Sequence, residues 1–338
     1  MMETKQKVLE LLERQRGEFT SGEQLAATLA VSRNAVWKAI DALRGDGFEI
    51  DAATRRGYRL AGGAMSEWSV ARHLADAQLP FALSKILVSR STDSTNAAAR
   101  ALAAAGAGEG TLVVAEEQTA GRGRQGRAFY SPSGTGVYFS VVLRPKLAAD
   151  RASLITTAAA VAVAGAIEEL SGGAASIKWV NDVFVNGKKV CGILTEASLD
   201  MESGGVEYAI LGIGVNLAPP HGGFPPEIAD IAGAVFADSP PPSDARERIV
   251  AGTVARFLSF YAELERKPFL DEYRARSFIV GRDVILNPDG EAEMARALSI
   301  DDDLRLIVRT ADGATRALSS GEVRLKVANL ASEAEGAI

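Results

Sequence analysis

Cysteine and histidine are almost missing from this sequence. Cys191 is the only cysteine among 338 residues, and His73 and His221 are the only histidines. A single cysteine cannot form a disulfide framework or a thiolate metal cluster. Two histidines do not predict a zinc site either. The composition fits a reducing compartment, so we predict a cytoplasmic protein in which Cys191 is a packing residue.

The sequence also lacks the long apolar segments that enter membranes. Residues 1–17 are charged throughout and contain no apolar stretch of the kind found in signal peptides. The most apolar stretch, residues 153–167, is rich in alanine, shorter than a membrane span and flanked by charges. We therefore expect a buried helix there and no membrane partner.

A large positive charge is lacking as well. The net charge is −6, which argues against a protein that coats nucleic acid. The charge is uneven, because residues 1–60 hold ten Lys and Arg against nine Asp and Glu, and the rest of the chain sums to about −7. Any contact with DNA must therefore be local.

What the sequence does contain divides into three segments, since 338 residues exceed one typical domain. Residues 1–62 have the pattern of three helices and a β-ribbon, and residues 61–64, Ala-Gly-Gly-Ala, are expected to be a linker. Residues 67–275 alternate helical and strand patterns. Residues 277–330 contain short strands with turn signals at 288–290, 311–313 and 320–321. The predicted fold class is α/β (α+β).

The first segment has the pattern of a winged helix-turn-helix. Apolar residues recur at helical spacing in the first helix. Ser21 precedes Gln24 by three residues, the spacing of a capping box that opens a second helix, and Ser32 would cap a third. Two short helices joined by a tight turn and followed by two extended runs over 50–60 predict a helix-turn-helix with a wing.

Polar side chains on the third helix and the wing are candidates for DNA contact. Those on the helix lie in its first two turns, where a recognition helix reaches base edges. The wing arginines would reach phosphate oxygens. The candidate DNA-binding residues are Ser32, Arg33, Asn34, Lys38, Arg55 and Arg56. The alternative is a protein-interaction module with a solvated polar face, but the wing and the local basic excess together favour DNA binding.

Residues 121–127, Gly-Arg-Gly-Arg-Gln-Gly-Arg, predict a site for an anionic ligand. The glycines let the backbone approach a ligand closely and leave the loop mobile, and the arginines supply forked donors for carboxylate or phosphate. A dinucleotide fingerprint requires a helix to begin inside the motif, whereas residues 129–134 continue as loop. The remaining alternative is a disordered surface loop.

Two further clusters predict walls of the same site. Residues 178–182, Lys-Trp-Val-Asn-Asp, precede the dipeptide 186–187, Asn-Gly, which is a type I′ hairpin signal. Lys189 and Gly192 on the return strand would then lie near residues 178–182. Residues 212–217, Gly-Ile-Gly-Val-Asn-Leu, are predicted to form a strand whose two glycines would let another group pack tightly on it. The alternative is a solvated hairpin without a ligand.

Taken in order, these clusters resemble the biotin protein ligase family. The resemblance rests on residues 94–96, 116–127, 178–182, 189–192 and 212–217 and extends through the N-terminal head and the C-terminal strands. With the head present, it is similar to the bifunctional class that combines a biotin ligase with a biotin-operon repressor. The implied fold is a winged helix-turn-helix, a central mixed-sheet catalytic domain of the biotin/lipoate ligase type and a C-terminal SH3-like small β-barrel.

The resemblance also implies roles for individual residues. Biotin would be held by Ser94, Thr95, Asn96, Gln118, Arg122, Gly123, Arg124, Lys189 and Gly192. The nucleotide would be held by Gly121, Arg127, Phe129, Lys178, Asn181 and Asn216. The catalytic residues would be Arg124, Lys189 and Asp182, and Asp182 would also bind Mg²⁺.

Two positions depart from the family pattern. Phe129 stands where the family commonly has a tryptophan that packs on adenine, and this change preserves a π face. Val180 replaces the proline that is usual in Lys-Trp-Pro-Asn-Asp, which alters the rigidity of the turn but removes no ligand.

The implied reaction uses ATP and Mg²⁺ to convert biotin into biotinyl-5′-AMP and then transfers biotin to a lysine of biotin carboxyl-carrier protein. Residues 121–127 would order over the adenylate and exclude water. The adenylate-bound chain would form a homodimer that binds operator DNA. Two alternatives stay open: a transcription factor that senses a small molecule without catalysis, and a lipoate or octanoate ligase of the same fold. The C-terminal barrel would assist ATP or acceptor docking or only stabilise the chain.

Overall fold

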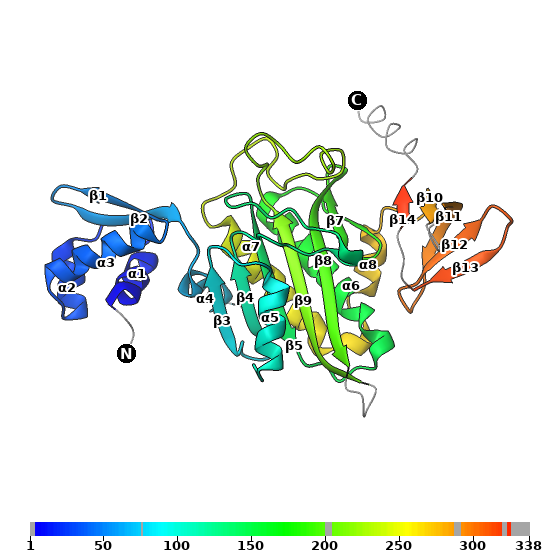
Figure 1. The fold of residues 1–338 in the computed structure, drawn as a ribbon, viewed down its shortest axis with the longest axis horizontal. Coiled ribbons are helices and arrows are strands. Elements are labelled where there is room, and N and C mark those ends of the chain that lie inside the picture. The colour runs from blue at the N-terminus through cyan, green and yellow to red at the C-terminus, as the bar shows by residue number, and fades with distance from the viewer. Residues whose placement is uncertain (1–3, 76, 200–204, 287–291, 320–322, 326–338) are drawn as a thin grey trace.

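The computed structural model describes residues 4–75, 77–199, 205–286, 292–319 and 323–325. Figure 1 shows three units in a row: an N-terminal head, a large central unit and a small C-terminal sheet. Helices and strands mix in the first two units, and the third is a sheet of strands. The predicted α/β class is confirmed.

The head is a winged helix-turn-helix, as predicted. Its elements are α1 (Thr4–Arg14), α2 (Gly22–Leu29), α3 (Arg33–Gly45), β1 (Phe48–Ala53) and β2 (Gly57–Gly63). Ser21 Oγ accepts a hydrogen bond from Gln24 N at 3.0 Å and Gln24 Oε1 accepts one from Ser21 N at 3.1 Å, which is the predicted capping box. Ser32 Oγ caps α3 by accepting from Ala35 N. Apolar side chains from all three helices and both strands form a separate core.

The linker expected over 61–64 is mostly strand. Residues 61–63 belong to β2, where Gly62 and Gly63 pair with Glu49 and Phe48. Gly63 has a φ of +100°, and a Cβ there would lie 2.4 Å from the carbonyl oxygen of Gly47. These glycines therefore serve a close turn of the ribbon rather than a flexible tether. The prediction of a linker there is wrong, because a Gly-Gly pair occurs both in flexible linkers and in close turns of a strand and its composition does not distinguish the two.

The central unit is built on a seven-stranded mixed sheet with the order β3-β4-β5-β9-β8-β7-β6. Only β3 and β4 are parallel, and the other neighbours are antiparallel. The strands are β3 (Lys85–Ser89), β4 (Thr111–Ala115), β5 (Gly136–Leu143), β6 (Ser176–Lys178), β7 (Asp182–Val185), β8 (Lys188–Leu199) and β9 (Val206–Asn216). The predicted hairpin is present, because Asn186 and Gly187 both have positive φ between β7 and β8.

Helices cover both faces of this sheet (Figure 1). They are α4 (Glu67–Ala75), α5 (Thr95–Ala104), α6 (Ser153–Ser171), α7 (Ala245–Ala262) and α8 (Leu270–Arg276). Successive residues of a strand point to opposite faces, so Val141 packs in the large core that contains α6 and α7, whereas Val142 packs under α5. The first turn of α5 is thereby held against the middle of the sheet.

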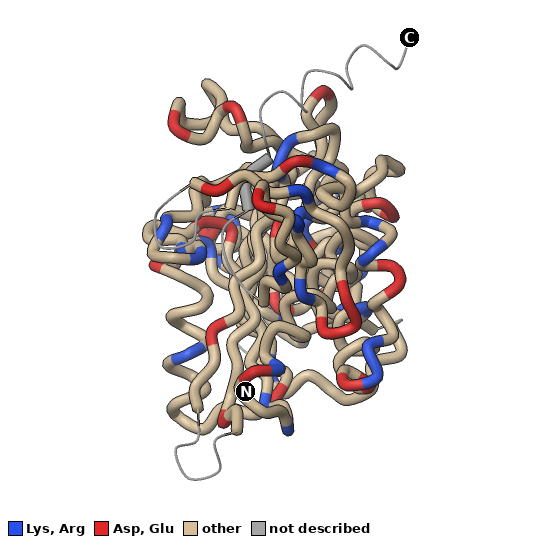
Figure 2. Tube along the Cα trace, turned by 90° about the vertical axis from the view of Figure 1, so that its right-hand side faces the viewer, with Lys and Arg blue, Asp and Glu red and all other residues tan. Residues whose placement is uncertain are grey.

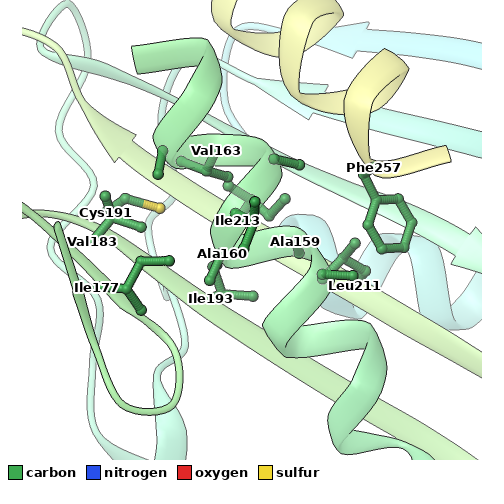
Figure 3. Close-up of a cluster of buried hydrophobic side chains, with 14 of the residues drawn as sticks. Ala159, Ala160, Val163, Ile177, Val183, Cys191, Ile193, Leu211, Ile213 and Phe257 are labelled. Carbon is green, nitrogen blue, oxygen red and sulfur yellow. The ribbon is translucent and has the colours of Figure 1, made fainter. Parts of the chain in front are cut away.

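Helix α6 forms the centre of the large core, as predicted for residues 153–167. Ala159, Ala160 and Val163 lie against Ile193 and Ile213 from the sheet (Figure 3). Among the described residues α6 is the one helix long and apolar enough to cross a membrane, but most of it is buried inside the protein. Its small side chains allow the helix to lie close to the sheet, so its apolar character is that of a core helix.

The C-terminal unit is a five-stranded antiparallel sheet with the order β13-β12-β11-β10-β14, consistent with the predicted SH3-like barrel. Its strands are β10 (Asp283–Leu286), β11 (Glu293–Ile300), β12 (Leu306–Thr310), β13 (Thr315–Leu318) and β14 (Val323–Leu325). The turn predicted at 311–313 joins β12 to β13. The turns predicted at 288–290 and 320–321 lie outside the described residues.

Charges of both signs are interspersed over the chain in Figure 2. Several of them connect the head to the central unit. Arg72 Nη1 donates to the carbonyl oxygen of Glu13 at 2.8 Å, and Met65 N donates to a carboxylate oxygen of Glu116 at 2.5 Å. Polar contacts with α4 and with Glu116, which follows β4, therefore attach the head.

Candidate active site

A cleft of about 500 Å³ opens between the first turn of α5, the loop after β4, the β7–β8 hairpin and the end of β9. Fifteen of the predicted site residues line it: Ser94, Thr95, Asn96, Gln118, Arg122, Gly123, Arg124, Arg127, Phe129, Lys178, Asn181, Asp182, Lys189, Gly192 and Asn216. Gly121 is buried behind the lining, where a Cβ would lie 2.4 Å from the carbonyl oxygen of Phe129. Gly121 therefore shapes the base of the loop instead of facing a ligand.

The first turn of α5 is tied to the loop after β4. Ser94 caps the helix, with Oγ 3.4 Å from Ala97 N. Gln118 Oε1 accepts hydrogen bonds from Thr95 N at 2.9 Å and from Thr95 Oγ1 at 3.1 Å. Gln118 Nε2 donates to Ser131 Oγ at 3.0 Å. These bonds fix a neutral polar wall whose donors and acceptors have set directions.

Ser140 and Glu196 support this wall from behind and were not predicted from the sequence. Ser140 Oγ, fully buried on β5, lies 2.8 Å from Thr95 Oγ1 and 2.7 Å from Asn96 Oδ1. Asn96 Nδ2 donates to Glu196 Oε2 at 2.8 Å, and the other Glu196 oxygen pairs with Arg100. The amide of Asn96 is therefore oriented with its oxygen over the sheet. Both partners stand in strands far from residue 96, and no local motif marks them.

Three glycines form the floor of the cleft. A Cβ on Gly212 would lie 1.9 Å from Asn96 Oδ1, and a Cβ on Gly214 would lie 2.5 Å from the ring of Phe129. A Cβ on Gly192 would also meet this ring, at 2.8 Å. The close packing predicted for the two glycines of β9 is thus present. Phe129 presents an aromatic ring to the cleft and makes an edge contact with the buried Tyr138.

The Gly/Arg loop is held in a compact turn. Gly123 N donates to the carbonyl oxygen of Arg127 at 2.7 Å, and Phe129 N donates to that of Gly121 at 2.9 Å. Arg124 reaches across the cleft, where its Nη1 donates to Asn181 Oδ1 at 3.1 Å. One arginine of the loop is thereby fixed against the hairpin that carries residues 178–182.

Lys189 and Asp182 form an ion pair inside the cleft. Lys189 Nζ lies 2.7 Å from Asp182 Oδ1, and both side chains are partly buried. This oxygen is buried without a partner that meets hydrogen-bond geometry, so the contact is electrostatic. A buried carboxylate oxygen that lacks a hydrogen bond is suited to an additional cation. The pair stands at the cationic side of the cleft together with Arg124.

The segment 178–182 is anchored by elements that follow it in the chain. The indole Nε1 of Trp179 donates to the carbonyl oxygen of Leu304 at 2.9 Å, and the buried Tyr273 hydroxyl donates to that of Val180 at 3.1 Å. Asn181 Nδ2 donates to the carbonyl oxygen of Ile193 at 3.0 Å. The C-terminal sheet thus contacts a strand end that lines the cleft, which the sequence had left undecided.

A fourth wall, residues 224–232, was missed by the sequence analysis. Phe224, Ile228 and Ile231 line the cleft from this loop. The loop is tied to β8, because Lys189 N donates to the carbonyl oxygen of Ile231 at 2.8 Å. Residues 219–226, Pro-Pro-His-Gly-Gly-Phe-Pro-Pro, read only as a turn-rich connection, so the pattern held no signal for an apolar wall.

Cys191 lies next to these groups but is not exposed to the cleft as a nucleophile. The thiol is fully buried, and burial raises its pKa well above the usual range. A thiol that stays protonated is a poor nucleophile. Its position in the core beside Val183 and Ile193 agrees with a packing role (Figure 3).

The DNA-binding candidates lie on the outside of the head. Arg33, Asn34 and Lys38 are exposed on α3, and Ser32 is its N-cap. Arg55 stands at the tip of the wing with a φ of +63°. The guanidinium of Arg56 lies 4.1 Å from the centre of the Phe19 ring, a cation–π contact that the sequence did not suggest.

The segment that forms most of the cleft and the head each match a known protein family. The biotin/lipoate A/B protein ligase family matches residues 88–216, and an HTH domain matches residues 4–59. The bifunctional ligase/repressor BirA of Bacillus subtilis is 43% identical over 227 residues, which are 67% of this chain and 68% of that protein. The protein of the same name from Bacillus spizizenii is 34% identical over 318 residues, 93% of this chain and 96% of its own.

Solved structures show the same relation. The biotin protein ligase from Aquifex aeolicus in complex with biotin and ATP is 26% identical, with a TM-score of 0.58, and the match covers 72% of this chain and 98% of the ligase. A variant of that ligase in complex with biotin is 27% identical with a TM-score of 0.59 and the same coverage.

Proposed function

This chain belongs to the biotin/lipoate A/B protein ligase family and, over nearly its full length, to the bifunctional ligase/repressors in it, and we propose how its residues perform both activities. The chain ligates biotin with ATP and carries a DNA-binding head for repression. The acceptor is a lysine of a carrier protein, and the intermediate is biotinyl-5′-AMP. Both steps take place in the cleft between α5 and the β7–β8 hairpin.

The division of the cleft into a neutral and a cationic side carries this proposal. Thr95, Asn96 and Gln118 offer oriented hydrogen bonds without net charge, which suits the ureido ring of biotin. Arg124 and Lys189 supply positive charge a short way along the same cleft. A ligand with a neutral polar head and an acidic tail would span both sides, with its carboxylate placed where phosphate charge must be stabilised.

In the first step a carboxylate oxygen of biotin attacks the α-phosphorus of ATP. A new P–O bond forms, the bond to the β-phosphate oxygen breaks, and pyrophosphate leaves. Negative charge concentrates on the phosphoryl oxygens, where Arg124 and the ammonium of Lys189 stabilise it. The protein acts by orientation and electrostatics and forms no covalent bond to substrate.

In the second step an acceptor lysine attacks the carbonyl carbon of the mixed anhydride. The amide bond forms, AMP leaves with the electron pair, and the amine releases a proton. The anhydride would hydrolyse in open water, so the loop 121–127 has to cover it. The hydrogen bond from Arg124 to Asn181 holds this loop against the hairpin and supports such a covering role.

The nucleotide side of the cleft fits ATP with Mg²⁺. Phe129 offers a ring face to adenine, and the apolar loop 224–232 borders the same space. Mg²⁺ commonly uses one or two protein carboxylates together with substrate phosphates. Asp182, whose Oδ1 pairs with Lys189 but makes no hydrogen bond, is the residue that would hold it. When bound, the ion would neutralise phosphate charge, and Asn216 and Lys178 would border the nucleotide.

The test of the ligase function is exchange of labelled pyrophosphate into ATP, measured with biotin, with lipoate and with neither acid. We expect exchange that depends on biotin. Exchange that depends on lipoate would assign the chain to the other activity in its family's name. Binding of biotin without any exchange would reduce the protein to a small-molecule sensor.

Repression would be linked to catalysis through the adenylate. We propose that the adenylate-bound chain dimerises and presents two heads to two half-sites of operator DNA in the cytoplasm. Acceptor protein would consume the adenylate and relieve repression. A gel-shift titration with upstream DNA of biotin genes, run with and without biotin plus ATP, tests this together with sedimentation. Equal affinity in both conditions would refute the link.

A further inference from the structure

One large aromatic side chain of the head faces solvent. Trp37 lies on α3 and is 54% exposed, whereas its neighbours Val36 and Ile40 are buried in the core of the head. The other tryptophans are more enclosed, since Trp179 is 4% exposed and Trp68 is half-buried against Arg72. The indole of Trp37 therefore contributes little to the packing of the head, and its exposure calls for another explanation.

The surroundings of Trp37 are polar and mostly basic. Arg33 precedes it by four residues and Asn34 by three, so both are its neighbours on the helix surface, and Lys38 follows directly. All three are exposed. Asp41, one turn further along, ends the basic part of the face. An apolar ring on a helix face that also carries Arg33 and Asn34 suits a polyanion that also offers apolar edges, which describes the major groove of DNA.

A second copy of the chain is a poorer occupant of this surface. A symmetric contact through Trp37 would bring the cations of one α3 near those of the other, and like charges in contact weaken an interface. The first two turns of a recognition helix are also the part that reaches base edges. Trp37 is the fifth residue of α3 and stands in its second turn.

The wing supplies the complementary type of contact. Phe19 is flanked by the guanidinium groups of Arg56 at 4.1 Å and Arg59 at 4.7 Å from its ring centre. Arg59 is also paired with Asp51 across the ribbon, so Arg56 and Arg55 at the tip are the wing cations left for phosphate. Contacts to phosphate position a protein on the duplex but carry no sequence information.

We propose that Trp37 is a sequence-reading residue of the head, whose ring packs against thymine 5-methyl groups in the major groove of the operator. This inference rests on the proposed repressor function and names the group that would give it specificity. Apolar contact with the thymine methyl distinguishes A·T from G·C pairs without a hydrogen bond. Arg55 on the wing serves as the matched residue that binds phosphate without reading sequence.

The test begins with duplexes selected from a random pool by the wild-type chain in the presence of biotin and ATP. We expect Trp37→Ala to lower affinity for the selected duplex by about tenfold or more and affinity for random duplexes by less than about twofold. Arg55→Ala should weaken both by a similar factor, since each lost phosphate contact acts on every sequence. Trp37→Phe, which keeps a ring, should lie between wild type and Trp37→Ala.

Replacing single thymines of the selected duplex by uracil removes one methyl group at a time. At one or more positions this change should weaken the wild-type complex and leave the Trp37→Ala complex unaffected. Biotin-dependent pyrophosphate exchange should be unchanged in every head variant, because α3 lies outside the cleft. This control shows that the central unit folds, and because the head has a core of its own, the binding of random duplexes that Trp37→Ala retains shows that its head folds.

The outcomes separate this inference from the function on which it rests. If the wild-type chain selects no sequence, the proposed repressor function fails and the inference fails with it. If the wild type selects a sequence and Trp37→Ala keeps the same preference, only the inference is overturned. A loss of self-association in Trp37→Ala without DNA, with sequence preference intact, would overturn it in favour of a protein contact.

Discussion

At the scale of single residues, Gly212 and Gly214 lie two positions apart on β9 and face the same side of the sheet. They nevertheless serve different parts of the cleft. A side chain on Gly212 would displace Asn96, which we propose to bind biotin, and one on Gly214 would displace the ring of Phe129, which we propose to bind the nucleotide. The two sites thus offer a matched pair of substitutions.

We expect Gly212→Ala to raise the KM for biotin and Gly214→Ala to raise the KM for ATP, each by about tenfold or more. Overpacking of this kind destabilises an arrangement by about 1–3 kcal/mol, and a factor of ten corresponds to about 1.4 kcal/mol. Pyrophosphate exchange with each substrate varied in turn measures both values. If both variants raised the same KM, the assignment of the two sides would be wrong.

Glu196 acts through Asn96 and does not line the cleft itself. Its two oxygens serve Asn96 and Arg100. In Glu196→Gln only one oxygen remains, so one of these partners loses its acceptor. We expect the KM for biotin to rise by about three- to tenfold, in line with the loss of a hydrogen bond in a charged network, while the KM for ATP stays unchanged. Glu169→Gln, which breaks an ion pair with Arg256 on α7, is the control and should change neither KM.

The sequence allowed prediction of those site residues that belong to a local motif whose residue types indicate a function. Arginines between glycines indicate an anion, and Asn186-Gly187 indicates the turn that brings Lys189 near Asp182. Ser140 and Glu196 carry no such mark, because their function depends on which strands become neighbours of α5. Trp37 was passed over for a similar reason, since an apolar residue in a helix is normally assigned to the core.

At the scale of elements, the strand end 178–182 is held from two directions. The hydroxyl of Tyr273 on α8 and the carbonyl of Leu304 in the turn before β12 bind Val180 and Trp179. This segment carries Asn181 and Asp182, which line the cleft and which we propose to bind the nucleotide and Mg²⁺. The elements after α7 therefore position part of the active site as well as adding stability.

We expect Tyr273→Phe to lower the thermal midpoint and to raise the KM for ATP a few-fold, with the KM for biotin unchanged. The substitution leaves a buried carbonyl without its donor, which costs about 1–3 kcal/mol. Tyr261→Phe is the matched control. The Tyr261 hydroxyl donates a hydrogen bond of 2.6 Å to Glu109, and neither residue lines the cleft. It should lower the midpoint without any change in KM, and an ATP effect as large as that of Tyr273→Phe would contradict the positioning role.

Elements with strong local sequence signals were predicted well, but the contacts that these elements make with distant parts of the chain were not. The capping box of Ser21 and Gln24 sets the start of α2, so this boundary could be read directly. The linker predicted for residues 61–64 was wrong because glycines occur both in linkers and in close strand turns. The contact between Trp179 and Leu304 joins residues 125 positions apart in the sequence, and neither periodicity nor turn chemistry reports on such a pair.

At the scale of the whole molecule, charged groups are enclosed where the head meets the central unit. Glu13 and Glu247 are almost fully buried, and Arg16 lies between them, 2.9 Å from Glu13 and 3.8 Å from Glu247. Asp244 and His73 stand close by. The order of the domains follows from the sequence pattern, but the faces that meet do not, because charged residues in a helix normally indicate solvent.

Burial raises the pKa of Glu247, and nearby Arg16 only partly offsets this effect. In the unfolded chain the carboxyl ionises around its ordinary value, so between the two pKa values the folded state holds more protons. The contribution of Glu247 to stability is therefore fully present below the unfolded pKa and is lost as pH rises through the raised folded pKa.

We expect Glu247→Gln to remove this dependence on pH. The thermal midpoint of the variant relative to wild type should rise as pH is increased from about 4.5 towards 7, because only the wild type must then bury a charged carboxylate. Arg16 keeps Glu13 as a partner in the variant, so no guanidinium is left unpaired. Differential scanning fluorimetry over this range measures the effect, with the exposed Glu265→Gln as control. If the difference in thermal midpoint between variant and wild type stayed constant across the range, ionisation of the buried Glu247 would not affect stability and the prediction would be wrong.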